Sequence, residues 1–248
     1  MMSNEREWLL REKYKGVESP EFFADLKRIE NGEPVDYVIG FSKFLGCHID
    51  LSKKPLIPRT ETEYWVEGAL NEIAIDKPIK ILDVFSGSGC IGIGALSRLP
   101  NAQVDFADLE PNAIEQIKIN LEKNAANSSR YVVYQSDVFD SIPAEKRYDV
   151  IFANPPYIGV KNKQRVQDSV FYYEPHNALF SGEDGMPLIN KTLTSLKERL
   201  TPNGVLYLEF DDIQQILLEK ILVGLGFTNY SFYKDQFGLV RLVKVLRS

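Results

Sequence analysis

Short apolar runs alternate with helical patterns along the chain from residue 79 onward. Such runs are typical of strands buried on both faces of a sheet, and the helical patterns show the 3.6-residue period of amphipathic helices. Strands are expected at 79–84, 103–108, 131–136 and 148–153, and helices at 91–98 and 111–124. This order predicts an α/β fold with a doubly wound parallel sheet, whose functional groups gather at the carboxyl ends of the strands.

The pattern changes near the end of the chain. A helix, a strand and a second helix are expected at 185–200, 204–210 and 213–222, followed by strands at 228–233 and 239–246. The two last strands are joined by the hairpin-like turn Asp235-Gln236-Phe237-Gly238. Because a tight turn joins antiparallel strands, we expect an antiparallel strand at this end of the sheet.

The first 76 residues are organised differently. Two short helical patterns at 5–15 and 21–31 precede two strand-like segments, 43–50 and 55–57, which we interpret as a hairpin. A helix at 61–75 follows, with Thr60 as its expected cap. We therefore divide the chain into a short N-terminal helical extension, a linker with hairpin and helix, and the α/β domain: 1–33, 34–76 and 77–248.

A glycine-rich turn follows the first strand of the α/β domain. It spans 85–89, and Gly87, Gly89 and Gly92 match the G-x-G-x-x-G pattern that dinucleotide and S-adenosylmethionine sites share. Glycines let the backbone approach a ligand closely, and the N-terminus of the following helix attracts a carboxylate or phosphate. Asp108 ends the next strand, where a carboxylate can accept both ribose hydroxyls of either cofactor.

Asn154-Pro155-Pro156-Tyr157 closes the apolar run 148–153 and is the most informative stretch of the chain. The Asn154 carboxamide oxygen and the Pro155 carbonyl lie close together in a segment that two prolines stiffen. Two such acceptors can hold both hydrogens of an NH2 group and favour the pyramidal nitrogen that attacks a methyl donor. Tyr157 can stack on a flat target. Together with the glycine turn, this motif favours methyl transfer over hydride transfer.

Composition and charge narrow the class of protein. With 248 residues, 44% of them hydrophobic and 26% charged, the chain can bury a substantial core. The net charge of −6 and the pI near 5.2 argue against stable nucleic-acid binding. No apolar run reaches the roughly 20 residues of a membrane span, and the N-terminus lacks a secretory signal, so we expect a cytoplasmic protein without a membrane partner. Two cysteines and two histidines complete no metal-ligand set, so no metal is expected.

Four motifs occur in order from about residue 34 to the C-terminus. They are Pro34-Val-Asp-Tyr37-Val-Ile-Gly40, Ile57-Pro58-Arg59-Thr60-Glu61-Thr62-Glu63, Asn154 to Tyr157, and Glu174-Pro175 with Ala178-Leu179 and Gly182-Glu183-Asp184-Gly185. This ordered set resembles the protein-(glutamine-N5) methyltransferases that modify peptide chain release factors. Two residues of this chain depart from the family's pattern. Phe85 stands where the family usually has the first glycine of its cofactor loop. Thr60 replaces the second proline of the family's Pro-Arg-Pro-Glu-Thr-Glu signature, which the segment 57–63 resembles. Only about 33 residues precede the linker, where the family has a domain of several helices.

The resemblance implies a Rossmann-like class I S-adenosylmethionine-dependent methyltransferase sheet in residues 77–248. S-adenosyl-L-methionine would be the cofactor and S-adenosyl-L-homocysteine the product. The methyl group would go to N5 of the glutamine in the Gly-Gly-Gln motif of a release factor, the protein partner of a monomeric enzyme. The residues implied at the cofactor are Phe85, Ser86, Gly87, Ser88, Gly89, Asp108, Asp137, Val138 and Asn154. Those implied at the substrate are Asn154, Pro155, Pro156 and Tyr157, with Asn154 and Tyr157 as the catalytic pair.

Other functions remain open from the sequence alone. A glutamine of a ribosomal protein would present the same amide. A flipped adenine of DNA or RNA offers the same NH2 geometry to an Asn-Pro-Pro-Tyr motif, so N6-adenine methylation is a second alternative. The third is a non-catalytic binding protein whose cofactor loop has decayed at Phe85.

Overall fold

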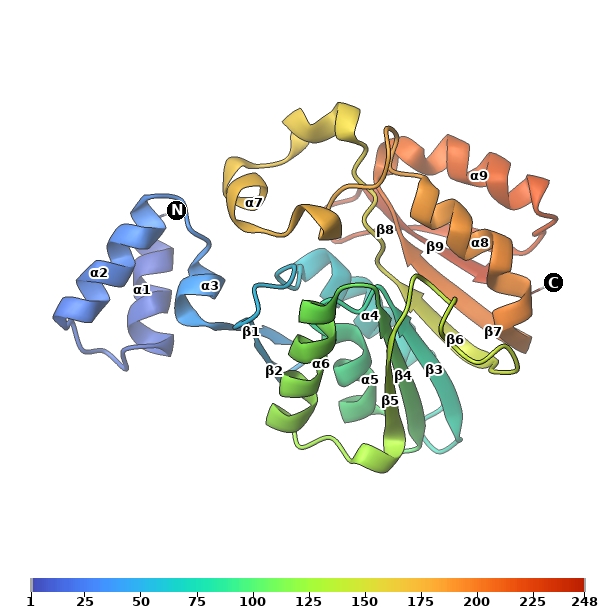
Figure 1. The fold of residues 1–248 in the computed structure, drawn as a ribbon, viewed down its shortest axis with the longest axis horizontal. Coiled ribbons are helices and arrows are strands. Elements are labelled where there is room, and N and C mark those ends of the chain that lie inside the picture. Colours follow the sequence, from blue (N-terminus) through green and yellow to red (C-terminus); the bar gives the residue numbers. More distant parts are fainter. Residues whose placement is uncertain (1, 248) are drawn as a thin grey trace.

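The computed structural model describes residues 2–247 and contains a seven-stranded mixed sheet (Figure 1). Its strand order is β5-β4-β3-β6-β7-β9-β8. The strands are β3 (Ile79–Val84), β4 (Ala102–Asp108), β5 (Tyr131–Gln135), β6 (Tyr148–Ala153), β7 (Leu200–Glu209), β8 (Tyr230–Lys234) and β9 (Val240–Leu246). Neighbours among β3 to β7 run parallel, whereas β9 is antiparallel to both β7 and β8. The predicted Rossmann-like sheet with an antiparallel C-terminal strand is confirmed.

Helices cover both faces of this sheet (Figure 1). Residues of α4 (Thr60–Asn71), α5 (Cys90–Arg98) and α6 (Pro111–Lys123) join one hydrophobic core, and residues of α8 (Pro187–Arg199) and α9 (Gln215–Gly224) join the other. Successive strand side chains point to opposite faces, so Ile81 belongs to the first core and Leu82 to the second. Burial on both faces explains why these strands are continuous apolar runs.

Both strands of the hairpin lie within residues 41–50, so the hairpin is shorter than the predicted one, which extended to residue 57. β1 (Phe41–Phe44) pairs antiparallel with β2 (Cys47–Asp50) across Leu45 and Gly46, whose φ angles are 50° and 82°. Two positive φ angles are typical of a type I′ hairpin turn. The expectation that 55–57 forms the second strand is wrong.

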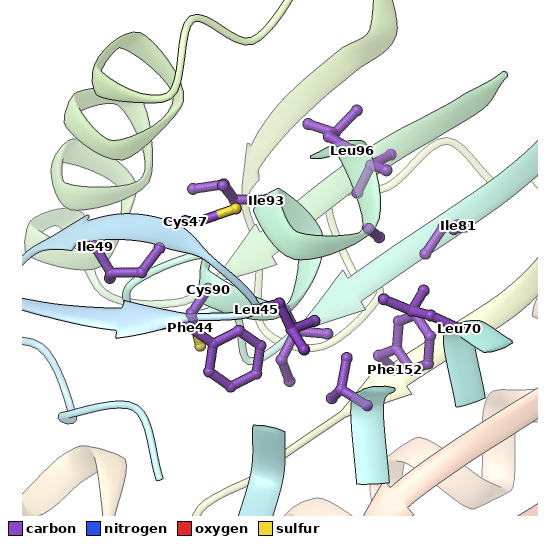
Figure 2. Packing of buried hydrophobic residues seen from close by; sticks show 14 of the residues in the cluster. Phe44, Leu45, Cys47, Ile49, Leu70, Ile81, Cys90, Ile93, Leu96 and Phe152 are labelled. Carbon is purple, nitrogen blue, oxygen red and sulfur yellow. The ribbon is translucent and has the colours of Figure 1, made fainter. Parts of the chain in front are cut away.

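The hairpin packs against α5 (Figure 2). Phe44, Leu45 and Cys47 belong to the same buried cluster as Cys90 and Ile93. A Cβ at residue 94 would lie 2.8 Å from the Leu45 Cδ1 atom, so the glycine there permits the close approach. The hairpin thereby covers the helix that follows the glycine-rich turn.

Helix α4 begins one residue earlier than predicted and ends before Ile75. Arg59 is its N-cap, and Thr60 is its first residue, so the expected capping role of Thr60 is wrong. The helix ends at Asn71. These differences leave α4 in place as the bridge between the hairpin and the sheet.

The helices of the N-terminal extension and a short helix at the start of the linker share a small core. The two predicted helices are present as α1 (Met2–Glu12) and α2 (Pro20–Glu30), and a third short helix, α3 (Val35–Ile39), was not predicted. The buried residues of this core are Leu9, Phe22, Ile29, Val35, Val38 and Ile39. In Figure 1 these helices lie to one side of the sheet, beyond β1 and β2.

The long segment after β6, which has no clear period in the sequence, contains three short helical turns. They are Val160–Arg165, α7 (Asp168–Tyr173) and His176–Ala178. Two further single turns occur at Ser128–Arg130 and Asp212–Gln214. Among residues 2–247, no helix is both long and apolar enough to span a membrane.

Candidate functional site

Two cavities open at the carboxyl ends of the parallel strands. The first is lined by Pro156 and by most of the predicted cofactor residues: Phe85, Ser86, Gly87, Ser88, Asp108, Asp137, Val138 and Asn154. The second is lined by Pro155, Tyr157 and, again, Asn154. Asn154 therefore borders both cavities. This arrangement suits a methyl donor in the first cavity, which we call the donor cavity, and an acceptor in the second, the acceptor cavity.

The glycine-rich turn begins with a phenylalanine in a left-handed conformation. Phe85 has a φ of 62°, the left-handed conformation that glycine adopts most easily and that costs other residues about 1 kcal/mol. The buried Ser86 hydroxyl donates to the Asp83 carbonyl at 2.7 Å and accepts from the Ala107 N–H at 3.0 Å. These bonds fasten the turn to both β3 and β4.

Two backbone N–H groups, one in the glycine-rich turn and one just after β4, hold the Asp108 carboxylate. Its Oδ2 accepts the Gly87 N–H at 2.8 Å, and its Oδ1 accepts the Glu110 N–H at 3.0 Å. Burial raises the pKa of Asp108, and these two backbone hydrogen bonds oppose the rise. Each carboxylate oxygen keeps a further lone pair, so the pair of oxygens can accept two neighbouring hydroxyls of a ribose.

Two glycines of the motif allow α5 to pack closely on neighbouring side chains. Gly89 is the N-cap of α5 with a φ of 78°, and a Cβ there would lie 3.2 Å from Ile117 Cγ1. A Cβ on Gly92 would lie 2.3 Å from Phe106 Cε1. Both positions therefore serve the packing of α5 on its neighbours, and Gly89 is set back from the donor cavity.

Asp137 and Val138 border the far side of the donor cavity, just after β5. Asp137 Oδ2 lies 2.9 Å from Lys191 Nζ, while Val138 is buried and has a φ of 56°. Leu109, half exposed, lines the same cavity. Apolar side chains beside an accessible carboxylate suit an adenine ring, which has two apolar faces and an amino edge. With the diol-binding geometry of Asp108, the residues present fit an adenosine group.

Asn154 follows the last residue of β6 and is held by a hydroxyl. Its Nδ2 donates to Thr62 Oγ1 at 3.3 Å, and Thr62 donates to Glu209 Oε2 at 2.7 Å. Glu209 ends β7, the strand beside β6, and Ala153 pairs with Leu208 in the register of the sheet. The topology thus brings Asn154 and Glu209 to the same edge of the sheet. Neither Thr62 nor Glu209 was predicted as a site residue.

Tyr157 shares the same carboxylate. Its hydroxyl donates to Glu209 Oε1 at 2.9 Å, and Trp65 Nε1 donates to Oε2 at 2.7 Å. Burial raises the pKa of Glu209, and its three hydrogen bonds oppose that rise. Burial and the Glu209 charge both raise the pKa of Tyr157 well above its ordinary value. The phenol therefore stays protonated, as a donor to Glu209.

An ion pair to a buried glutamate joins two of the sequence motifs around the site. Arg59 Nη2 lies 2.7 Å from Glu174 Oε1, and the Ile57 N–H donates to Glu174 Oε2 at 3.0 Å. The Glu174 side chain is fully buried. Arg59 lines both cavities, so this pair fixes the segment before α4 against the segment after α7 at the mouth of the site.

Comparison with known proteins gives the family. A model described as "Methyltransferase small domain" matches residues 69–194. A release factor glutamine methyltransferase of Lactococcus lactis subsp. lactis is 34% identical over 249 residues, covering 98% of this chain and 88% of the relative. Another, from Flavobacterium psychrophilum, is 32% identical over 225 residues, covering 89% of this chain and 78% of the relative. The chain belongs to the family of release factor glutamine methyltransferases.

A solved structure supports the fold. The structure of a 16S rRNA methyltransferase from T. Thermophilus in complex with AdoMet and guanosine superposes with a TM-score of 0.60 at 17% identity, covering 84% of this chain and 50% of that chain. The residues of the donor cavity fit an adenosine group, which agrees with S-adenosylmethionine as the cofactor of this methyltransferase family. The sequence-based recognition of the family is confirmed.

Proposed function

We propose that this chain transfers a methyl group from S-adenosylmethionine to N5 of the glutamine in the Gly-Gly-Gln loop of a peptide chain release factor. The observation that carries the proposal is that Asn154 borders both the donor and the acceptor cavity in a member of this family. We further propose that the enzyme acts as a monomer in the cytoplasm, where release factors take part in translation.

In the donor cavity, the residues of the chain bind and orient the cofactor. Asp108 would accept its ribose hydroxyls, and Val138 and Asp137 would border its adenine. The turn 85–89 presents a backbone without bulky side chains at Gly87, where a Cβ would meet open space. The cofactor supplies an electrophilic methyl group when bound.

In the acceptor cavity, Asn154 and Pro155 act on the glutamine amide. An amide nitrogen is a poor nucleophile because its lone pair is delocalised into the carbonyl. The Asn154 Oδ1 atom and the Pro155 carbonyl accept the two amide hydrogens and favour the pyramidal nitrogen of the transition state, in which those hydrogens carry more positive charge. Tyr157 packs against the amide and holds it in line.

No residue of the site needs to act as a general base. The nitrogen becomes strongly acidic once it carries the methyl group, so it loses its proton to water afterwards. The raised pKa of Tyr157 agrees with this, because a phenol held protonated by burial cannot serve as the base.

A labelled transfer assay tests the choice of acceptor. The purified chain is incubated with methyl-labelled S-adenosylmethionine and, in separate reactions, with a bacterial release factor, ribosomal proteins and adenine-containing DNA. We expect label in the release factor alone. Label in the ribosomal proteins or in DNA, with none in the release factor, would overturn the proposal.

A further inference from the structure

We infer that Thr62 is a positioning residue that sets which way the Asn154 carboxamide is turned. In this orientation the carboxamide oxygen, and not its NH2 group, faces the acceptor cavity. The inference rests on the proposed function, because it concerns how the same site holds an amide. Thr62 lies in the first turn of α4, and only 2% of it is exposed.

The direction of the hydrogen bonds follows from the groups around Glu209 Oε2. An indole N–H can only donate, so the 2.7 Å contact from Trp65 Nε1 places a proton on the side of Oε2 that faces the indole. The second 2.7 Å contact to the same oxygen comes from Thr62 Oγ1. An ionised carboxylate carries only lone pairs, so with Glu209 ionised the single hydroxyl proton of Thr62 points at Oε2.

This leaves Thr62 with lone pairs alone for its contact with Asn154. The carboxamide must therefore present Nδ2, at 3.3 Å, because its oxygen would place two acceptors against each other. The two ends of a carboxamide have nearly the same shape, so packing distinguishes them poorly and the hydrogen-bond partner decides. With Nδ2 facing Thr62, the carboxamide oxygen points away from Thr62.

The orientation decides whether the site can act. An acceptor amide presents two N–H donors, and a carboxamide turned the other way would meet them with donors of its own. The same carboxylate also accepts the Tyr157 hydroxyl at 2.9 Å. Glu209 therefore holds both predicted catalytic residues, Tyr157 directly and Asn154 through Thr62.

The fold places the side chains of this hydrogen-bond network close together. Thr62 and Trp65 are three residues apart on α4, so both side chains reach the same carboxylate. Asn154 and Glu209 follow paired positions at the ends of β6 and β7. Glu209 is only 2% exposed, so water does not compete for its lone pairs.

Steady-state kinetics with release factor as acceptor test the inference. Thr62→Val keeps the size of the side chain and removes the hydroxyl, and we expect kcat to fall roughly 10- to 100-fold with unchanged cofactor affinity. Thr62→Ser keeps the hydroxyl and should stay within roughly threefold of the parent. The matched control is Thr192→Val, since Thr192 is fully buried but donates to the Leu188 carbonyl within α8. Its kcat should be that of the parent.

A second readout does not depend on any acceptor. The side-chain NH2 signals of Asn154 in an NMR spectrum are assigned by their loss in Asn154→Asp. We expect their exchange with solvent to be slow in the parent and in Thr62→Ser, and faster in Thr62→Val, because the bond to the hydroxyl is lost.

The outcomes separate the two proposals. Parental kcat in Thr62→Val, equal loss in the valine and serine variants, or unchanged NH2 exchange in Thr62→Val would each overturn the role of Thr62. If the parent methylates no release factor, the proposed function fails, and the exchange measurement alone then decides the inference.

Discussion

The Asp108 carboxylate combines a structural and a binding role in one side chain. It bonds the turn at Gly87 and the backbone at Glu110, and its remaining lone pairs face the donor cavity. We expect Asp108→Ala to weaken cofactor binding by about 1–3 kcal/mol, since the ribose hydroxyls would lose their acceptor. Titration calorimetry measures the change, with the exposed Asp140→Ala as control. Unchanged affinity would contradict the assignment.

Asn154 belongs to the acceptor side of the chemistry. Its carboxamide borders both cavities, but the bonds that hold it come from α4 and not from the cofactor turn. We expect Asn154→Ala to abolish methyl transfer while cofactor affinity stays within roughly threefold, because the donor cavity keeps Asp108 and the turn. A transfer assay beside calorimetry checks both quantities. Equal loss of transfer and of cofactor binding in a folded variant would refute this role.

Asp83 is a fully buried carboxylate behind the cofactor turn. Gly92 N–H donates to its Oδ2 at 2.9 Å, while Oδ1 has no hydrogen-bond partner among the described residues. Burial raises its pKa from 3.8 to about 7. The folded protein therefore keeps a proton on Asp83 that the unfolded chain releases near its ordinary pKa. By linkage, the free energy of unfolding falls as pH rises from about 4 to about 7.

Asp83→Asn should remove this decrease in the free energy of unfolding, because an asparagine does not titrate. We expect the variant to gain stability relative to the parent at about pH 8, by at most about 4 kcal/mol, and to lose this advantage at about pH 4. Urea unfolding at both pH values measures the difference, with the exposed Asp140→Asn as control. A difference in unfolding free energy that is the same at both pH values would rule out the titration of Asp83 as its cause.

Single site residues were predictable where a motif carries them. Asn154 and Asp108 end apolar runs, and their positions at strand ends follow from the sheet. Thr62 and Glu209 were not predicted to interact, because they are 147 residues apart and their contact depends on how α4 packs across β7. The left-handed conformation of Phe85 was not predicted either, because the residue type does not favour a positive φ.

The segment before α4 and the segment after α7 are joined by one ion pair. Glu174 is buried and Arg59 is about one third exposed, so removing the arginine leaves a buried charge without its partner. We expect Arg59→Ala to lower the free energy of unfolding by about 3 kcal/mol, the low end for such a loss because solvent reaches Arg59. Urea unfolding measures it.

The control is an ion pair whose arginine is more exposed and lines the same acceptor cavity. Arg165 contacts Asp211 at 3.0 Å with 45% of its side chain exposed, so Arg165→Ala should cost less than about 1 kcal/mol. Equal costs for the two arginines would show that the burial of Glu174 does not matter to stability.

Strands and helices with a strong apolar period were predicted well, and irregular elements were not. The hairpin was misplaced because its turn uses Leu45 in a left-handed conformation, which the sequence does not signal, whereas Pro55 resembles a turn boundary. The short helix α7 was missed because its helical turns are held by contacts of Glu174 and Tyr173 with distant segments. Tertiary contacts, rather than local propensity, determine these elements.

The whole molecule is built so that two cores meet at one functional edge. The first core lies under α4 to α6 and the second under α8 and α9, and the donor and acceptor cavities open where strands of both cores end. The separate core of the N-terminal helices lies beyond the hairpin (Figure 1). The division of the chain at residues 33 and 76 stays a prediction, which limited proteolysis of the intact chain can address.

Peptide mass spectrometry of a treated release factor tests the central claim most directly. A bacterial release factor and its Gln→Ala variant in the Gly-Gly-Gln loop are incubated with this chain and S-adenosylmethionine, then digested and fragmented. The account predicts one added methyl group, located on the glutamine of that loop and absent from the variant. A methyl group on any other residue, or equal methylation of the variant, would contradict it.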